Sequence, residues 1–513
     1  MRCLVGFSYI ASFAVLVAAG CGGAGSNAET ECVDNVCPCS EGGLRAAISE
    51  AGIRAAITEG LGPYTFDCDG PTTIITGREI VIDIDVTLDG GGNLTVDGNR
   101  THRVFSVLDS VTAELIGFTV TNGRESEQDG GGIRNEGTLT LRNATVSESS
   151  AGRETGCRTT DPNLLCSEGG GIWNAGTLTL MDSTVSGNTA PFGGGISNRD
   201  GSLTVIDSVI RMNSADGCRV GDAFCSFGGG VWNSGMLTVE NSTVSGNASD
   251  WGGGIFNRGV REPTIRNSTI SGNSAGSDGG GLLNFATLTL VGSTVADNVA
   301  GQSGGGVANQ RPGTLEVTTS TLSGNTAAAA GGGLFNPAGA AAELLNTTVS
   351  TNTAEREGGG IYTGGELVLI SSTIARNDAL IRASAIYDDP DSPSARVRSI
   401  ANTLIEGDCA DSPPFDSDGY NIESPGDTCG FNDATDRPAE DQLNLGPLQN
   451  NDGPTLTHAL LENSAAIDQI PAADCVDGAG DLLTADQRGK PRPAGVDSSC
   501  DVGAFEVQPE VQP

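Results

Sequence analysis

The chain has few of the basic residues that catalysis and nucleic-acid binding use. Among 513 residues, lysine occurs only at Lys490 and histidine only at His102 and His458. No lysine base is therefore present before residue 490, and two separated histidines without a partner motif are weak evidence for acid–base catalysis. Asp and Glu number 64 against 27 Lys and Arg, which gives a net charge of −37. This charge argues against nucleic acid as a partner, because nucleic-acid binding needs a positive surface.

The N-terminal segment lacks an apolar run long enough to cross a membrane. The run from Ile10 to Ala19 is too short for a span and is typical of a signal peptide. The overlapping stretch Leu16–Cys21 resembles a bacterial lipobox, with Cys21 as the lipid-bearing residue. Cleavage after Gly20 without lipid attachment is the alternative. The sequence therefore predicts an exported protein, held at the outer membrane or cell surface only by its N-terminal lipid, or secreted.

Cysteine usage supports export. Of fourteen cysteines, Cys3 lies in the predicted signal peptide and Cys21 at its end, which leaves an even number. Such usage is typical of a disulfide framework formed in an oxidising compartment. Zinc at Cys37 and Cys39 is the alternative, but their spacing is poor for zinc and histidine partners are missing, so we expect no metal and no cofactor. The disulfide candidates are Cys157, Cys166, Cys218, Cys225, Cys409, Cys429, Cys475 and Cys500, and the pairing of Cys32, Cys37, Cys39 and Cys68 is open.

The chain repeats a run of three glycines. Successive runs are separated by 39, 24, 35, 24, 27, 25, 27 and 27 residues. The underlying period is therefore about 25 residues with two insertions, and a period of that length is the mark of a solenoid. The runs begin at Gly130, Gly169, Gly193, Gly228, Gly252, Gly279, Gly304, Gly331 and Gly358.

One period contains three short alternating segments separated by turn residues. In residues 169–192 these segments centre on Ile172, Leu178 with Leu180, and Val185. Each pattern predicts a short strand with its aliphatic side chains on one face. Three strands per coil, stacked about 4.8 Å apart in parallel, form an all-β parallel β-helix. Parallel crossovers are right-handed, which sets the hand of the helix.

An asparagine follows nearly every triple glycine, and a second asparagine closes each Ser-Thr-Val-Ser-Gly-Asn segment. Asn174 and Asn188 are the two examples in residues 169–192, and Thr363 interrupts the first series. Asparagines stacked at turns hydrogen-bond along a solenoid. Because every coil has them, we interpret both series as structural rather than as ligands of a site.

Composition divides the chain into four parts. Residues 1–21 form the signal peptide with its lipobox-like end, and residues 22–71 form a tether and an N-terminal cap with one helix at 44–59. Residues 72–409 form the β-helix. Residues 410–513 form a loop-rich, disulfide-bonded C-terminal segment, since 13 of the 21 prolines lie after residue 380 and the triple glycines end.

The repeat Val-Ser-Gly-Asn-Thr-Ala followed by Gly-Gly-Gly-Ile-x-Asn resembles repeats of chlamydial-type polymorphic outer membrane proteins. The whole chain resembles bacterial surface proteins that carry the choice-of-anchor Q domain. The resemblance implies a secreted or surface-held right-handed β-helix, with the pectin-lyase-like shape and an undefined activity. The tail motifs that carry it are Gly446-Pro447-Leu448, Gly453-Pro454-Thr455, Thr457-His458-Ala459-Leu460, Ala466-Ile467-Asp468, Asp486-Gln487-Arg488-Gly489 and Cys500-Asp501-Val502-Gly503-Ala504-Phe505-Glu506.

Pectate lyases and polygalacturonases share this shape, but fold is not function. The solenoid holds no lysine, and the paired carboxylates Asp388 and Asp389 lie in a proline-rich stretch that predicts a solvated turn. We therefore predict no catalytic residues. The expected function is a non-catalytic, adhesin-like protein that binds an extracellular polysaccharide or a surface protein. A polysaccharide lyase or hydrolase and a structural spacer are the alternatives, and the oligomeric state is open.

Two insertions precede triple glycines, and each carries a predicted cysteine pair: Cys157 with Cys166, and Cys218 with Cys225. Because both enter the coil at the same place, we expect the loops side by side. An outward line of side chains on the strand after the glycines runs beside them. This line is either a recognition surface of exposed aromatics or simply covered by the loops. Its aromatic residues are Trp173, Trp232, Phe256, Phe335 and Tyr362.

Overall fold

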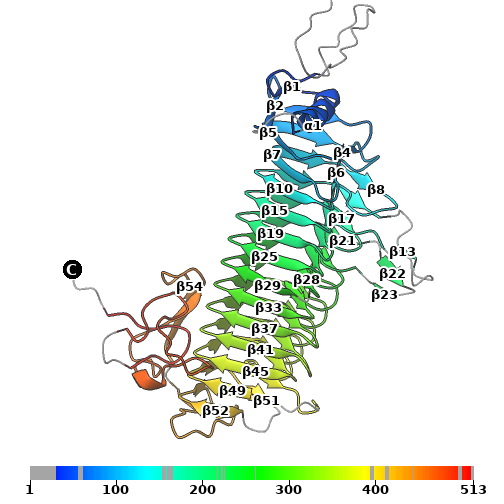
Figure 1. The fold of residues 1–513 in the computed structure, drawn as a ribbon. Helices are drawn as coiled ribbons and strands as arrows, with labels where there is room; N and C mark the ends of the chain where they lie inside the picture. The colour runs from blue at the N-terminus through cyan, green and yellow to red at the C-terminus, as the bar shows by residue number, and fades with distance from the viewer. Residues whose placement is uncertain are drawn as a thin grey trace, which may run out of the picture.

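The computed structural model describes residues 31–55, 62–152, 157–158, 166–216, 218–220, 223–224, 226–259, 261–392, 398–410, 415–441, 443–494 and 499–509. The chain winds into a long stack of coils (Figure 1). Successive coils pair in parallel along three sheets, so the predicted parallel β-helix is confirmed.

The first sheet contains the strands that follow the triple glycines. It has 13 strands within the described residues, and neighbouring coils pair in register, with Ile172 opposite Ile133 and Ile196. Its strands are β4 (Ile80–Ile82), β6 (Phe105–Val107), β9 (Ile133–Asn135), β14 (Ile172–Asn174), β18 (Ile196–Asn198), β24 (Val231–Asn233), β28 (Ile255–Asn257), β32 (Leu282–Asn284), β36 (Val307–Asn309), β40 (Leu334–Asn336), β44 (Ile361–Thr363), β48 (Ile386–Asp388) and β51 (Cys409–Ala410).

The second sheet receives two strands from most coils, so its 27 described strands form two series that meet at a bend. The first series is β10 (Thr138–Arg142), β15 (Thr177–Met181), β19 (Ser202–Ile206), β25 (Met236–Glu240), β29 (Arg261–Arg266), β33 (Thr287–Val291), β37 (Thr314–Thr318), β41 (Ala341–Leu345), β45 (Glu366–Ile370), β49 (Arg398–Ala401) and β52 (Asp416–Gly419). The second series is β11 (Thr145–Ser147), β16 (Thr184–Ser186), β20 (Val209–Arg211), β26 (Thr243–Ser245), β30 (Thr269–Ser271), β34 (Thr294–Ala296), β38 (Thr321–Ser323), β42 (Thr348–Ser350), β46 (Thr373–Ala375), β50 (Leu404–Glu406) and β53 (Ile422–Ser424). The N-terminal members are β1 (Val36–Pro38), β2 (Tyr64–Asp67), β3 (Thr72–Ile75), β5 (Val86–Asp97) and β7 (Thr112–Thr121).

The third sheet is built from two-residue strands that the sequence analysis missed, because a pair of residues shows no periodicity. A full coil therefore contains four strands rather than three. The described strands of this sheet are β8 (Arg124–Glu125), β12 (Ser150–Ala151), β17 (Thr189–Ala190), β21 (Ser214–Ala215), β27 (Ala248–Ser249), β31 (Ser274–Ala275), β35 (Val299–Ala300), β39 (Thr326–Ala327), β43 (Thr353–Ala354) and β47 (Asp378–Ala379).

The inside of the coils is one continuous apolar core. Ile172, Leu178, Leu180 and Val185 are fully buried, as are their counterparts in neighbouring coils. Each such side chain contributes about 1.5–3 kcal/mol through burial. The core therefore grows with every coil, and the predicted aliphatic lines are confirmed.

Polar side chains form ladders where the coils turn. Asn174 Nδ2 donates to Asn198 Oδ1 at 2.7 Å, and Asn188 Nδ2 donates to Asn213 Oδ1 at 3.0 Å. Both ladders are buried, so the structural interpretation of the asparagines is confirmed. A serine ladder at the bend of the second sheet was not predicted; in it the Ser183 amide donates to the Oγ of the serine one coil on, at 2.9 Å.

The triple glycine is needed for two reasons. Gly169 has a φ of +68°, a left-handed conformation that glycine adopts without strain. Gly170 has no room for a side chain, because an added Cβ would lie 2.4 Å from the carbonyl oxygen of Gly194 in the next coil. The glycines therefore allow the coils to approach each other at this corner.

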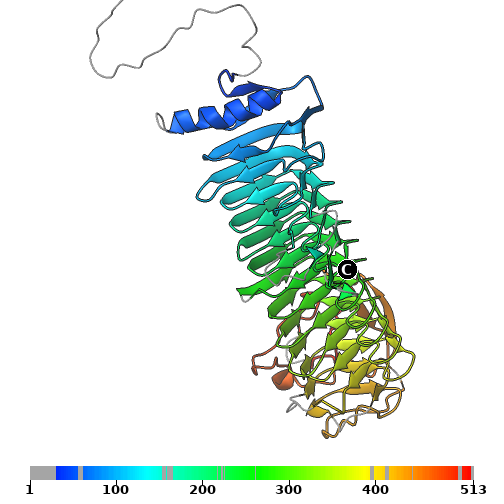
Figure 2. The same ribbon diagram turned by 90° about the vertical axis from the view of Figure 1, so that its right-hand side faces the viewer.

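Helix α1 (Glu41–Ala55) covers the N-terminal end of the coils, as Figure 2 shows. Leu44 and Ile48 are buried against the core, and Arg45 Nη2 donates to the carbonyl oxygen of Glu79 at 3.1 Å. The predicted helical cap is therefore present, although it begins earlier than expected and residues 56–61 are not described. Among the described helices, none combines the length and apolarity needed to cross a bilayer.

Disulfide bonds hold both ends of the chain. They join Cys32 to Cys37, Cys39 to Cys68, Cys409 to Cys429 and Cys475 to Cys500. Such bonds are typical of exported proteins. The lipid candidate Cys21 lies outside the described residues, so lipidation stays a prediction, as do the domain limits. Parallel pairing itself extends from β1 to β53.

The C-terminal segment folds back against the side of the last coils (Figure 1). It contains the antiparallel pair β54 (Leu445–Gln449) and β55 (Thr457–Leu460) and the 3-10 turn η1 (Ala472–Asp474). Thr348 Oγ1 of strand β42 donates to Gln487 Oε1 at 2.6 Å, and Gln487 Nε2 donates to the Ser320 carbonyl oxygen at 3.0 Å. The segment therefore covers the second series of the second sheet over several coils.

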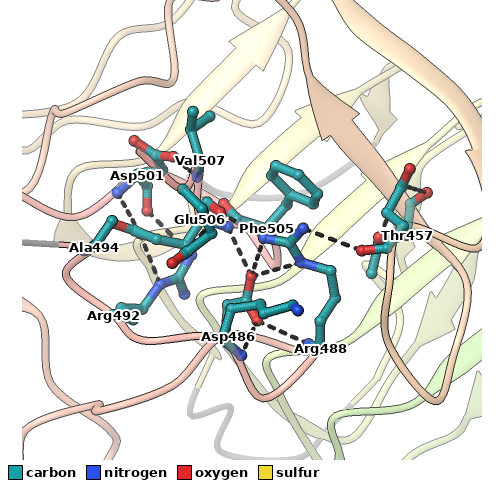
Figure 3. Close-up of polar contacts among 12 residues, drawn as sticks. Thr457, Asp486, Arg488, Arg492, Ala494, Asp501, Phe505, Glu506 and Val507 are labelled. Atoms are coloured by element: carbon teal, nitrogen blue, oxygen red, sulfur yellow. Dashed lines mark hydrogen bonds and ion pairs between the residues drawn. The ribbon is translucent and has the colours of Figure 1, made fainter. Parts of the chain in front are cut away.

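A buried polar network organises this segment (Figure 3). The Arg492 side chain is fully buried and pairs with Glu506 at 3.2 Å, and it also donates to Asn346 Oδ1 of the solenoid at 3.0 Å. Asp486 binds Arg488, whose guanidinium carbon lies 3.6 Å from the centre of the Phe505 ring. The tail motifs Asp486–Gly489 and Cys500–Glu506 thus dock the segment onto the β-helix.

Candidate functional site

The central residues of the first-sheet strands form a line on the outside of the coils, which we call the outer line. Parallel register places each of them beside the next one. Strand alternation therefore predicted the direction of these side chains correctly. The outer line consists of Trp173, Ser197, Trp232, Phe256, Leu283, Ala308, Phe335, Tyr362 and Tyr387.

The upstream part of the outer line is not exposed. Trp173 is 8% exposed, Trp232 is 7% exposed and Phe256 is 6% exposed. Of the two alternatives drawn from the sequence, exposed aromatics are therefore wrong for these three residues, and a covered line is confirmed for them. Alternation tells which side of a strand a side chain lies on, but not whether another segment covers that side.

Trp232 and Phe256 are covered by aromatic residues immediately before the triple glycines, whereas the Arg134 guanidinium lies over the Trp173 ring. Phe192, Phe227 and Trp251 occupy this position in successive coils and pack against the outer line. Phe227 meets Phe256 edge-on with ring centres 5.0 Å apart. The sequence contains a signal for this cluster, because an aromatic residue precedes three successive triple glycines.

The downstream part of the outer line is more accessible. Phe335 and Tyr362 are half-buried, with stacked rings whose centres are 4.8 Å apart, and Tyr387 continues the stack at 5.3 Å. Since the ring faces are used against each other, the edges and the Tyr362 hydroxyl are what the surface offers a ligand. Burial and then Asp389 raise the pKa of Tyr362, so it remains a neutral hydroxyl.

A hollow of about 220 Å³ lies beside these rings. Arg356 and Glu357 supply opposite charges at its edge. This site combines apolar ring edges, a hydroxyl group and one side chain of each charge. Such a combination can bind a polar polymer such as a glycan. The described residues that line it are Ser303, Ala329, Ala330, Phe335, Arg356, Glu357 and Tyr362.

A buried carboxyl lies at the upstream end of the outer line. Glu168 is 2% exposed; Arg199 Nη1 donates to its Oε1 at 2.5 Å and Ser197 Oγ donates to its Oε2 at 2.9 Å. Burial raises the pKa of Glu168 to about 7, against the opposing effect of Arg199. Asp129 accepts a hydrogen bond from the Glu168 amide at 2.9 Å, and burial raises its pKa as well.

A carboxyl that titrates near neutrality is a property of many catalytic acids and bases. Here both oxygens of Glu168 are engaged by side chains of the next coil, and the group is enclosed. The arrangement ties three coils together and makes that tie sensitive to pH. No sequence signal identified Glu168, because its burial depends on neighbouring coils.

The two insertions lie next to each other, as predicted. Strand β13 (Cys157–Arg158) pairs in parallel with β22 (Cys218–Val220), and β22 pairs with β23 (Ala223–Phe224). Figure 1 shows these strands projecting from the coils. Cys166 is disulfide-bonded, but Cys225 lies outside the described residues, so the predicted pairing within each insertion stays a prediction.

A match to a family model supports the fold. Residues 172–354 match the model of a family described as the right handed beta helix region. The right-handed parallel β-helix is thus confirmed. The A-module of mannuronan C-5 epimerase AlgE6 from Azotobacter vinelandii is similar over 75% of this chain and 94% of its own, with 13% identity and a TM-score of 0.32. No curated protein matches the chain.

Both histidines of the β-helix protein have structural contacts. His102 Nε2 lies 2.8 Å from Thr76 Oγ1, and His458 Nε2 lies 2.8 Å from Ser350 Oγ. Burial lowers the pKa of both rings, so they are neutral at pH 7. His458, which is 1% exposed, joins the C-terminal segment to strand β42.

Asp388 corrects one expectation from the sequence. It lies in strand β48 and is fully buried rather than in a solvated turn. Its partner in the neighbouring coil is Thr363, the residue that interrupts the first asparagine series. Pro390 lies just after the end of strand β48, and Asp388 belongs to the strand rather than to the following loop. Elsewhere in the described part of the chain, no three His, Cys, Asp or Glu side chains converge to hold a metal ion.

Proposed function

We propose that this protein is an exported, non-catalytic β-helix that binds an extracellular polymer or surface partner along the downstream outer line. The observation that carries the proposal is the half-buried pair Phe335 and Tyr362 beside the hollow flanked by Arg356 and Glu357. These groups combine apolar edges with hydrogen-bonding and charged groups, as glycan and protein ligands require.

Export is part of the proposal. The disulfide bonds support an oxidising compartment. Attachment through a lipid on Cys21 would place the β-helix at the outer membrane or cell surface, with the solenoid as a rigid stalk that presents the outer line. Cleavage without lipid would release it as a secreted protein. Intact-mass analysis and detergent partitioning of the exported protein distinguish these two outcomes.

A polysaccharide lyase or hydrolase is the second candidate. The pKa of Glu168, raised to about 7, is the observation that favours it. Its enclosed position and its bonds to Ser197 and Arg199 weigh against it. We therefore rank binding without cleavage first.

A binding screen with matched variants tests the proposal. The exported protein is titrated against isolated cell-wall polymers and a glycan panel, while released unsaturated sugars are measured in parallel. We expect Phe335→Ala with Tyr362→Ala to weaken binding by about tenfold or more, since aromatic contacts contribute about 0.5–1.5 kcal/mol each beyond the area they bury.

The control variant is Met212→Ala with Val299→Ala, which removes two exposed apolar side chains from other faces. It should bind as the parent does. Equal binding by the aromatic variant would contradict the proposed surface. If the protein cleaves a polymer and Glu168→Gln abolishes that cleavage, the lyase or hydrolase hypothesis replaces the binding proposal.

A further inference from the structure

A cleft of about 850 Å³ lies between the second sheet and the C-terminal segment, near strands β45, β49 and β52. Its floor is the outer face of the sheet, where Val368 and Ala401 present apolar side chains, while Ile370 is buried beneath the loop at Gly478. The loop that follows η1, residues 475–480, forms the opposite wall. The cleft therefore exists only because the tail folds back on the solenoid.

The rim of this cleft is acidic. Asp418 contacts Ser399 on one side, and Asp474 accepts a hydrogen bond from the Tyr420 hydroxyl at 2.7 Å on the other. Asp433 and Asp477 complete the rim. None of the described lining residues is a lysine or arginine. The rim thus carries four carboxylates around an apolar floor.

Negative charge continues beyond the rim. Glu343, one coil before the floor, has its pKa raised by burial and then by Glu316 and Asp477. The low dielectric of the sheet and the tail concentrates the field of these groups in the cleft. A cationic ligand would therefore be attracted to this site.

The carboxylates are not arranged for a metal ion. In the described part of the chain no three such groups converge on one point. They are instead distributed around an elongated opening whose floor is apolar. This distribution suits a ligand whose positive charges are separated by methylene segments, because the segments can lie on the floor while each ammonium group meets a carboxylate.

We propose that the cleft binds a linear polyamine, with its methylene chain on Val368 and Ala401 and its ammonium groups at Asp418, Asp474 and Asp477. Tyr420 lies within the same wall and offers an aromatic ring to a cation. The cleft is separate from the outer line, so a test of polyamine binding can be positive or negative independently of the proposed function.

Calorimetric titration of the full chain with spermidine tests the proposal at physiological ionic strength, where non-specific attraction is screened. We expect one saturable site per chain. Asp418→Asn with Asp474→Asn removes two charges from opposite walls and should weaken binding by about tenfold, since an exposed charge pair contributes up to about 1 kcal/mol. Val368→Asn should weaken binding by about threefold or more, because it removes apolar contact between the floor of the cleft and the methylene chain.

The matched control is Asp182→Asn with Asp207→Asn. Both aspartates are exposed on early coils and have φ values near +48°, which asparagine tolerates equally. This variant has the same change of net charge and should retain the parent affinity. Thermal unfolding verifies that both double variants are folded.

Three results would overturn the proposal. Equal weakening in the control variant would show attraction to the whole acidic surface. Saturable binding of hexalysine without binding of spermidine would identify a basic peptide as the occupant. Absence of a saturable spermidine site in the parent would show that the cleft binds no polyamine.

Discussion

The tripeptide Thr-Val-Ser occurs in early and in late coils with different surroundings. In strand β16 the outward Thr184 and Ser186 are partly exposed, whereas in strand β42 the outward Thr348 and Ser350 are fully buried. The backbone and the inward valine are equivalent in both coils. The difference comes from the C-terminal segment, which covers the late coils and bonds to Thr348 and Ser350.

The early coils have a different cover on another face. There Phe192 and Phe227 pack against the outer-line residues Trp232 and Phe256 of the next coil, so the cover comes from neighbouring repeats. The late coils instead receive cover on the second sheet from a segment more than 100 residues away in sequence. One region is therefore closed by the repeat itself, and the other by a tertiary contact.

The largest effect should come from removing the buried tryptophans of the outer line in the early coils. We expect Trp173→Ala with Trp232→Ala to reduce the free energy of unfolding by about 5 kcal/mol or more, since loss of a buried aromatic typically costs roughly 3–5 kcal/mol. Hydrogen exchange should increase in the early coils first. Unchanged stability with a loss of ligand binding would show that these tryptophans form a recognition surface after all.

The loss of the buried arginine in the C-terminal segment should have the second-largest effect on stability. We expect Arg492→Ala to destabilise the C-terminal segment by about 3–5 kcal/mol, because Glu506 would remain buried without its partner. Limited proteolysis should then cleave the tail while the early coils stay intact. Arg142→Ala, which breaks the partly exposed pair with Glu114, should cost about 1 kcal/mol or less.

The pH dependence should separate the two regions further. The folded-state pKa of Glu168 is about 7, above its unfolded value of 4.5, so the folded state holds a proton more tightly and stability falls as pH rises through this interval. We expect the early coils to lose roughly 1–3 kcal/mol between pH 4.5 and 7. Chemical denaturation across that range measures the slope, and Glu168→Gln should flatten it.

The smallest predicted effect compares the repeated threonines directly. Thr348→Ala should cost about 1–2 kcal/mol, because it removes the donor to the buried Oε1 of Gln487. Thr184→Ala should cost less than about 0.5 kcal/mol, as expected for a surface position. Equal costs at the two sites would show that the tail does not dock on strand β42 in solution.

Regular spacing explains why so much of the fold could be predicted. The triple glycines, the inward aliphatics and the two asparagines recur at fixed positions of the repeat, so the pattern of one period, such as 169–192, predicts the others. The strand of two residues at Thr189–Ala190 escaped because it is too short to show a period. Outward threonine and serine residues occur in early and late coils alike, so they do not indicate which coils the C-terminal segment covers.

The sequence by itself determined the solenoid, because each coil specifies its own strands, corners and core positions and stacks only on its neighbours. It also determined the direction of the outer line through strand alternation. Only the tertiary structure decided which outward side chains are buried, how Glu168 is enclosed, and where the tail creates the acidic cleft. The physical reason is that exposure depends on contacts between segments whose separation in sequence follows no period.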